Sequence, residues 1–144
     1  HNPQVVDAQI RARGAEPVSL ADLYAGSDYI TLHLPYTEQT RSMVGGTAFS
    51  QMKDGVRIVS TARGGIIDEA ALLAALNSGK VAGAALDVFA QEPHGLTELI
   101  SHPRVIGTPH IGAQTAEAQS RASVDIAEEM LSALQGTPLR WKVN

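Results

Sequence analysis

The sequence predicts an α/β fold built on a parallel β-sheet. Short apolar runs alternate with helix-forming segments along its 144 residues, and this alternation is typical of strands joined by crossover helices. The strand candidates show little polar alternation, as expected of parallel strands covered on both faces. The length, the even composition and the lack of an internal repeat favour one domain that spans residues 1–144.

Capping and breaking residues divide the first half of the chain. The elements expected there are a helix over 5–12, a short strand at Pro17-Val18, a helix after Ser19, a strand over Tyr29–Leu34 and a helix from Thr47 to Met52. Ser19 and Thr47 are typical N-caps. Gly14 and Gly26 can end the two early helices, and Pro35 ends the strand.

The second half repeats this alternation. It predicts a strand over Val56–Thr61, a helix over Glu69–Ser78, a strand over Val81–Val88, a helical turn near 96–100, a strand over Arg104–Thr108 and a long helix over 115–135. Asp68 and Thr115 are the expected N-caps. Gly79 supplies the C-terminal stop of the helix before it.

Composition argues against several classes of function. The net charge is −4, the pI is near 5.7, and the eleven lysines and arginines are scattered, so we expect neither a nucleic-acid partner nor a membrane surface. No apolar run reaches the roughly 20 residues that a membrane helix needs. Cysteine is absent, which excludes disulfides and thiolate metal sites. We expect a cytoplasmic protein that carries no metal.

Three polar residues follow the ends of predicted strands. Arg63 comes after the strand over 56–61, Glu92 after the strand over 81–88, and His110 after the strand over 104–108. In an open parallel sheet, ligands bind outside the carboxyl ends of the strands. These residues can therefore converge if the strands are neighbours.

The chemistry of the three residues is coherent. The Arg63 guanidinium can hold a carboxylate bidentately. His110 can exchange a proton with a hydroxyl or carbonyl oxygen, and Glu92 beside it would favour the charged imidazole. This combination suits the oxidation of a 2-hydroxy acid. A cofactor must accept the hydride, because no side chain can do so.

Simpler interpretations of the same residues remain open. Arg63 fits a structural ion pair, Glu92 fits a solvated turn residue, and His110 fits a loop histidine bonded to a backbone carbonyl. His33 lies in a strand candidate and fits a packed or ligand-lining residue better than a base.

Several long motifs add a resemblance that covers essentially the whole chain. They are Ser60-Thr-Ala-Arg-Gly-Gly-Ile-Ile-Asp-Glu-Ala-Ala-Leu72, Gly79-Lys-Val-Ala-Gly-Ala-Ala-Leu-Asp-Val-Phe89 with Glu92-Pro93, and Thr108-Pro-His-Ile-Gly-Ala113. In this order they resemble the D-isomer-specific 2-hydroxyacid dehydrogenases, closest to the branch of D-3-phosphoglycerate dehydrogenases and glyoxylate/hydroxypyruvate reductases. Formate dehydrogenases of the same superfamily carry glutamine at the position of Glu92, so that branch fits poorly.

The resemblance implies a Rossmann-like, doubly wound parallel sheet with flanking helices. It implies that Arg63 binds the substrate carboxylate, that His110 is the acid–base group and that Glu92 pairs with His110. The cofactor-binding positions that it implies are Asn2, His33, Leu34, Pro35, Thr61, Ala62, Arg63, Asp87, His110, Gly112 and Ala113. Among these, His33-Leu34-Pro35 match the H-x-P motif of the adenosine side, and Asp87 matches the position near the nicotinamide carboxamide.

Two departures from the family pattern matter. Asn2 stands where an aspartate usually accepts hydrogen bonds from the adenosine ribose, so we expect NAD as cofactor with NADP as an alternative. No two glycines are separated by a single residue, so the G-x-G-x-x-G phosphate-binding turn is absent. We therefore expect a partial NAD-binding domain that lacks the first βα unit, with helix 115–135 and the tail included, and little or no turnover by the chain alone.

The resulting hypothesis is an NAD-dependent D-2-hydroxyacid dehydrogenase of the EC 1.1.1 type that acts on a small 2-hydroxy or 2-oxo acid, of the phosphoglycerate or hydroxypyruvate/glyoxylate kind. The resemblance also implies a homodimer. Two alternatives share the fold: a non-catalytic, NAD-sensing binding module like the transcriptional corepressors, and a dimerisation fragment.

Overall fold

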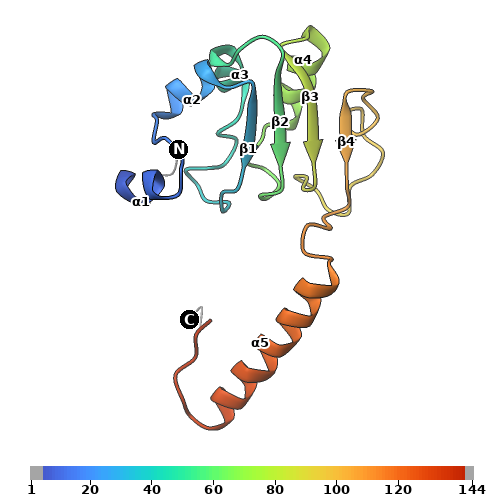
Figure 1. Ribbon diagram of the computed structural model, residues 1–144. Helices are drawn as coiled ribbons and strands as arrows, with labels where there is room; N and C mark the ends of the chain where they lie inside the picture. The colour runs from blue at the N-terminus through green and yellow to red at the C-terminus, as the bar shows by residue number, and fades with distance from the viewer. Residues whose placement is uncertain (1–4, 142–144) are drawn as a thin grey trace. The chain divides into compact units, whose positions relative to one another are not determined.

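The computed structural model describes residues 5–141, which form two compact units divided between Pro109 and His110. The first unit contains a four-stranded parallel sheet in the order β1-β2-β3-β4 (Figure 1). Its strands are β1 (Tyr29–Leu32), β2 (Val56–Ser60), β3 (Val81–Leu86) and β4 (Val105–Gly107). The predicted α/β fold with a parallel sheet is confirmed.

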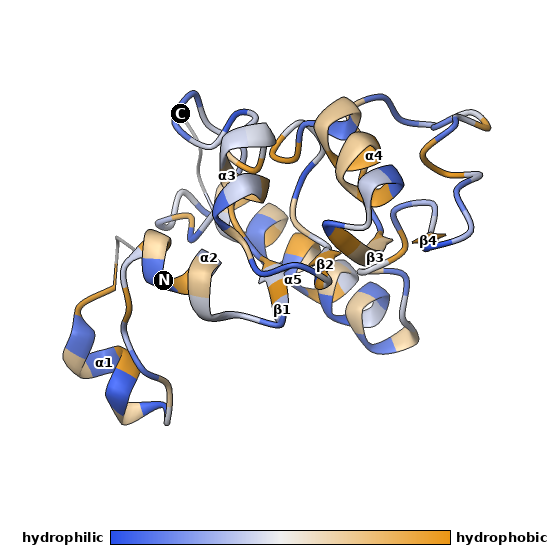
Figure 2. Cartoon of the chain, turned by 90° about the horizontal axis from the view of Figure 1, so that it is seen from above, coloured by the Kyte–Doolittle hydropathy of each residue, from blue (hydrophilic) through white to orange (hydrophobic). Residues whose placement is uncertain are grey.

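The helices of the first unit are α1 (Asp7–Ala12), α2 (Leu20–Gly26), α3 (Gly46–Gln51) and α4 (Glu69–Ser78). Helices α3 and α4 lie on the same face of the sheet (Figure 2). They connect β1 to β2 and β2 to β3, and right-handed crossovers between sequential neighbours place both helices on one side.

Local sequence signals explain where α2 and α4 begin and end. The Ser19 hydroxyl accepts the Asp22 N–H at 3.1 Å, and the Asp68 carboxylate accepts the Ala71 N–H at 3.0 Å. Gly79 closes α4 in the left-handed conformation at φ +81°, which favours glycine because it has no Cβ. The predicted caps of these helices are confirmed.

One hydrophobic core lies between the helices and the sheet. Its most deeply buried side chains come from β2, β3, α4 and the segments that lead into α3 and α4: Val44, Val56, Ile58, Ile66, Leu72, Leu76 and Val81. Burial of these apolar groups is the main source of the unit's stability.

Four predictions of local structure need correction. Residues 15–19 form no strand, and Pro17 has no N–H to donate to a ladder. The N-cap of α3 is Gly45 rather than Thr47, because the chain has already turned there after the bridge between Val44 and Ile67. Strand β1 is covered on one face only, since Tyr29 is 66% exposed. Each strand also ends one or two residues earlier than predicted.

The strand register brings the carboxyl ends of the strands to one edge of the sheet. Leu32 of β1 lies opposite Ser60 of β2, and Ser60 lies opposite Leu86 of β3. Beyond the last pair, the Asp87 N–H donates to the Ser60 carbonyl and the Thr108 N–H donates to the Leu86 carbonyl, both at 2.9 Å. The segments that follow β2, β3 and β4 therefore start side by side.

The second unit contains α5 (Ala116–Leu134) and a tail. The Thr115 hydroxyl accepts the Ala118 N–H at 3.1 Å, so the predicted N-cap is confirmed. Gly136 turns the chain at φ +69°. The tail folds back on α5, where the Arg140 N–H donates to both oxygens of the Glu129 carboxylate at 3.1 and 3.2 Å.

Candidate active site

The turn after β2 carries Arg63 at the carboxyl edge of the sheet. Arg63 is exposed, and its guanidinium Nη1 donates to the Ala62 carbonyl at 2.7 Å. Gly65 has φ +80°, and its carbonyl accepts the Ser42 N–H at 2.8 Å. Gly65 therefore lets the chain turn sharply two residues after Arg63, in a conformation that favours glycine.

The lack of a side chain at Gly64 lets this turn lie against the turn after β3. A Cβ at Gly64 would lie 1.8 Å from the Phe89 carbonyl oxygen and 2.9 Å from the Ala90 nitrogen. Both atoms belong to backbone, so no side-chain rotation could relieve the clash. Position 64 must be glycine for the two turns to pack this closely.

The turn after β3 carries Asp87 and Glu92. Asp87 is buried, and its carboxylate accepts a hydrogen bond from the Thr108 hydroxyl at 2.5 Å. Glu92 is exposed, and its Oε1 accepts the Phe89 N–H at 3.0 Å. The Glu92 carboxylate therefore closes the turn in which it stands, and its exposure leaves the interpretation as a solvated turn residue open beside the catalytic one.

An open groove lies beside the carboxyl ends of β1 and β2, with a volume of about 490 Å³. Its lining comes from the segments that follow these strands: His33, Leu34, Pro35, Tyr36, Thr61, Ala62 and Arg63. The His33 ring lies between two hydroxyls, with Nε2 2.8 Å from the Thr31 oxygen and Nδ1 3.4 Å from the Thr61 oxygen. His33 thus joins the two walls of the groove.

His110, Gly112 and Ala113 belong to the second unit. His110 adopts φ +55°, a left-handed conformation that is uncommon for residues other than glycine. The Ala113 carbonyl accepts the side-chain amide of Gln119 at 3.2 Å. His110 stands two residues after Thr108, which is bonded to the end of β3.

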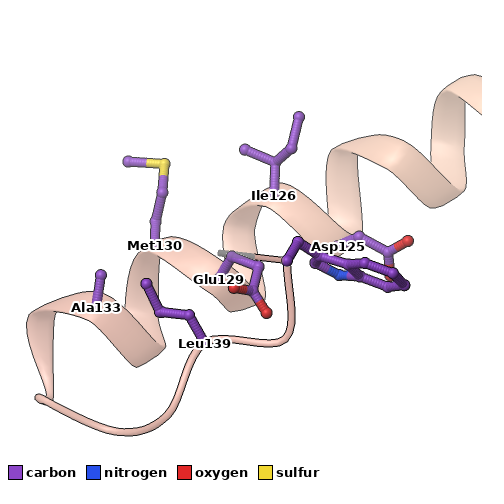
Figure 3. A pocket seen from close by; sticks show the side chains of 7 residues that line it. Asp125, Ile126, Glu129, Met130, Ala133 and Leu139 are labelled. Atoms are coloured by element: carbon purple, nitrogen blue, oxygen red, sulfur yellow. The ribbon is translucent and has the colours of Figure 1, made fainter. Parts of the chain in front are cut away.

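A separate cavity of about 450 Å³ lies between α5 and the tail (Figure 3). Ile126, Met130 and Ala133 project from the helix and Leu139 from the tail. Trp141, Asp125 and Glu129 complete the lining. This cavity is apolar except for its two carboxylates, and none of the predicted site residues lines it.

The structure thus brings together part of the predicted site. One groove gathers His33, Leu34, Pro35, Thr61, Ala62 and Arg63, and the adjoining turn holds Asp87 and Glu92. His110, Gly112 and Ala113 lie in the other unit. Asn2 lies outside the described residues.

Sequence reasoning missed three contributors. Tyr36 lines the groove and packs against Gly65, Thr108 bonds Asp87, and Glu69 accepts the Ala90 N–H at 2.6 Å. Asp68-Glu69, which follows the Arg63-Gly-Gly turn after two isoleucines, was the available signal for Glu69, but it indicated only the start of a helix.

Two groups with shifted pKa values lie away from the groove. A hydrogen bond from Lys80, 2.8 Å away, lowers the pKa of Asp54, which precedes β2 at the opposite end of that strand. Burial raises the pKa of Tyr24 on α2.

Two other kinds of site were sought in the described part of the chain. Residues 5–141 contain no cluster of three or more His, Asp or Glu side chains that could hold a metal ion. None of the helices in this range is long and apolar enough to cross a membrane.

Comparison with known proteins decides the family. The model of the D-isomer specific 2-hydroxyacid dehydrogenase, NAD binding domain, matches residues 1–112. The chain belongs to this family. The resemblance seen in the motifs is therefore confirmed, and with it the Rossmann-like fold class.

Relatives and solved structures agree with this assignment. The chain is 48% identical to D-3-phosphoglycerate dehydrogenase 3 of Arabidopsis thaliana, over its whole length and 25% of the relative. It is 41% identical to the D-3-phosphoglycerate dehydrogenase of Bacillus subtilis, over 99% of this chain and 27% of the relative. A glyoxylate reductase from Paecilomyes thermophila superposes with a TM-score of 0.91 at 40% identity, covering 99% of this chain and 43% of the other.

The chain thus spans about a quarter of the length of these curated relatives. The shared part includes every motif on which the resemblance rests, since the alignment with the Arabidopsis relative covers the whole chain.

Proposed function

We propose that this chain forms the NAD-binding part of an enzyme that transfers a hydride between NAD(H) and a D-2-hydroxy acid or its 2-oxo acid. One observation carries the proposal: the turns that bear Arg63 and Glu92 pack backbone to backbone at the carboxyl ends of neighbouring strands. The family to which the chain belongs has this chemistry. The proposed domain covers residues 1–144, with helix 115–135 and the tail included.

The groove fits part of a dinucleotide. Its volume of about 490 Å³ lies within the roughly 300–1,000 Å³ of typical ligand pockets. We assign His33, Leu34 and Pro35 to the adenosine side, and Thr61, Ala62, Arg63, Asp87, His110, Gly112 and Ala113 to the nicotinamide side. When it is bound, the nicotinamide ring supplies the hydride chemistry. Asn2 is assigned to the adenosine ribose, and NADP is the alternative cofactor.

Arg63 would hold the substrate carboxylate. Its planar guanidinium offers several N–H donors that match a carboxylate with two parallel hydrogen bonds. Gly64 and Gly65 let the backbone turn immediately behind the side chain, so the arginine is presented at the edge of the groove that it lines. Binding at this point would orient the carbonyl or hydroxyl carbon next to the carboxylate.

His110 would move the proton. It would accept the hydroxyl proton when the hydroxy acid is oxidised and return it when the oxo acid is reduced. The Glu92 carboxylate would stabilise the charged imidazole that forms during this exchange. The hydrogen bond from the Phe89 N–H holds the Glu92 side chain at 3.0 Å, which limits the orientations that the carboxylate can adopt.

The substrate and assembly are part of the same proposal. The curated relatives are named as D-3-phosphoglycerate dehydrogenases and the structural neighbour as a glyoxylate reductase, so we propose a substrate of the phosphoglycerate or hydroxypyruvate/glyoxylate kind. We also propose a cytoplasmic homodimer. Because the G-x-G-x-x-G turn is absent from the sequence, the isolated chain should bind NAD weakly and show little or no turnover.

A chimaera tests the proposal. These 144 residues replace the matching segment of the Bacillus subtilis relative, and NADH oxidation is followed with hydroxypyruvate, glyoxylate and phosphohydroxypyruvate. We expect turnover by the chimaera and almost none by the isolated chain. A folded chimaera that binds NADH but reduces none of these acids would contradict the proposal and favour the NAD-sensing binding module.

The role of Arg63 has its own test in the same chimaera. Arg63→Met should lower kcat/KM for the oxo acid by about 100-fold or more, because each lost charge-assisted hydrogen bond contributes about 1.5–3 kcal/mol. Arg63→Lys should recover little of this loss, since an ammonium group does not form the bidentate pair. Arg57→Met is the control, because Arg57 is exposed on β2 and lies over the Tyr29 ring rather than in the groove.

A further inference from the structure

Glu69 occupies the first turn of α4 and has two possible roles there. A carboxylate at this position interacts favourably with the helix dipole, which is the ordinary reason for an acidic residue directly after an N-cap. In the structure, however, Glu69 also reaches away from its helix. Its Oε1 accepts the Ala90 N–H at 2.6 Å, across 21 residues of sequence.

This bond ties α4 to the turn after β3. Ala90 is exposed, so its N–H would otherwise exchange readily with water. On one side of Ala90, the Phe89 carbonyl packs against Gly64. On the other side, the turn runs on to Glu92, whose carboxylate accepts the Phe89 N–H. Glu69 therefore bonds the backbone at the point where the turn meets the Arg63–Gly64 segment.

The geometry of these contacts links Glu69 to the candidate site. The Gly64 contact is a limit on close approach, and it cannot by itself hold the two turns together. A hydrogen bond to a carboxylate is attractive and is stronger than one between neutral groups. The Glu69 bond thus opposes movement of the Phe89–Glu92 turn away from the turn that carries Arg63.

We propose that Glu69 is a positioning residue that holds the Phe89–Glu92 turn against the Arg63–Gly64 turn and so sets the place of the Glu92 carboxylate. The consequence for catalysis rests on the proposed function of Glu92. The positioning itself does not, because it concerns contacts within the first unit.

Two substitutions separate the positioning role from the helix-dipole role. Glu69→Asp keeps the negative charge at the start of α4 but shortens the side chain by one methylene, so it cannot reach the Ala90 N–H. Glu69→Gln removes the charge but keeps the length and an amide oxygen that can accept the bond. If Glu69 acts through Ala90, Gln preserves its effect and Asp loses it. If Glu69 acts only on the helix dipole, the order reverses.

Amide hydrogen exchange, measured by NMR on the ¹⁵N-labelled 144-residue chain, reads out the positioning directly. We expect the Ala90 and Phe89 amides to exchange about tenfold faster in Glu69→Asp than in wild type, and within about threefold of wild type in Glu69→Gln, as the loss of one hydrogen bond implies. The Leu72 amide, inside α4, is the internal reference, and thermal unfolding of each variant reports on the helix. Wild-type exchange at Ala90 in Glu69→Asp would overturn the inference.

The chimaera gives a second measurement. Glu69→Asp should lower kcat for oxo-acid reduction by about tenfold with a small change in KM for NADH, because misplaced catalytic groups reduce the rate. Glu69→Gln should stay close to wild type. Equal losses in both variants would overturn the link to Glu92. A folded wild-type chimaera that binds NADH but does not turn over would refute the proposed function, while the exchange pattern at Ala90 would still decide the positioning role.

Discussion

In α4 of the first unit Leu72 and Leu76 are fully buried, whereas none of the described residues of α5 is buried and Leu134 is 83% exposed. Both helices begin with an N-cap that the sequence indicates, Asp68 in one and Thr115 in the other. The sequence therefore indicates the first residue of both helices through the same kind of N-cap. The difference lies in what their apolar side chains contact.

This contrast shows where the part of the candidate site in the first unit obtains its rigidity. The turn that carries Arg63 runs directly into α4, whose leucines anchor it in the core. Hydrophobic stabilisation comes from removing apolar surface from water, so the exposed leucines of α5 contribute little within their own unit. The chemistry that depends on exact placement is therefore best tested in the first unit.

This contrast predicts that a Leu→Ala substitution lowers the free energy of unfolding much more in α4 than in α5. Leu72→Ala should lower the free energy of unfolding by about 3 kcal/mol, because it leaves a cavity in a packed core. Leu134→Ala should change it by less than about 0.5 kcal/mol, as is usual for exposed positions. Urea unfolding monitored by circular dichroism measures both. Similar losses in the two variants would contradict the contrast.

A smaller but more specific effect is expected at Gly64. Gly64→Ala places a methyl group 1.8 Å from the Phe89 carbonyl oxygen, and forcing the backbones apart should cost about 2–3 kcal/mol. Gly26→Ala is the matched control, since a Cβ there meets no atom within 4 Å. The unfolding midpoints in urea compare the two variants. If Gly64→Ala were as stable as the control, the two turns could not be packed as described.

Tyr24 places a hydroxyl group in the hydrophobic core of the first unit. Its side chain is 4% exposed, and its hydroxyl has no hydrogen-bond partner within residues 5–141. Tyr24→Phe should therefore raise the stability by about 1 kcal/mol, because a buried unsatisfied hydroxyl is removed. A loss of stability instead would show that this hydroxyl makes a favourable bond in solution.

The Tyr24 hydroxyl also predicts a pH dependence. Burial raises its pKa above the ordinary value of about 10, so the unfolded chain ionises first as the pH rises. Stability is unaffected below pH 10 and is lost as the pH rises through the folded-state pKa. The alkaline loss should be weaker in Tyr24→Phe, as measured by thermal unfolding across this pH range.

The smallest effect is expected at the opposite end of the sheet. Lys80 lowers the pKa of the fully exposed Asp54 below its ordinary value of 3.8. Its stabilisation is present above the unfolded-state pKa and is lost as the pH falls through the folded-state pKa. Asp54→Asn should therefore melt slightly below wild type at neutral pH and together with it in strong acid. A persistent difference in acid would point to a cause other than the ion pair.

Much of the fold could be predicted from the sequence because its signals are local. Ser19, Asp68 and Thr115 each cap a helix within three residues of themselves, and Gly79 closes α4 at its end. The positions of strands were predicted less accurately than those of helices. The sequence predicted a strand at Pro17-Val18, but residues 15–19 form none, because strand pairing depends on a neighbouring strand rather than on composition.

The candidate site shows the same limit. Arg63, Glu92 and Asp87 could be singled out because they follow strand candidates and stand in family motifs. The contact between Gly64 and Phe89 and the bond between Glu69 and Ala90 could not, because both depend on the register that places Ser60 opposite Leu86. No pattern within either segment specifies that register.

The most direct test of the central claim, that the carboxyl edge of the sheet binds the cofactor, is an NMR titration of the ¹⁵N-labelled chain with NAD at millimolar concentrations. We predict that the amide signals of His33, Leu34 and Tyr36 and of Thr61–Arg63 shift together. The signals of Asp54 and Gly55, at the other end of β2, should stay in place. Shifts confined to that other end, or no shift in the groove across the millimolar range, would contradict the claim.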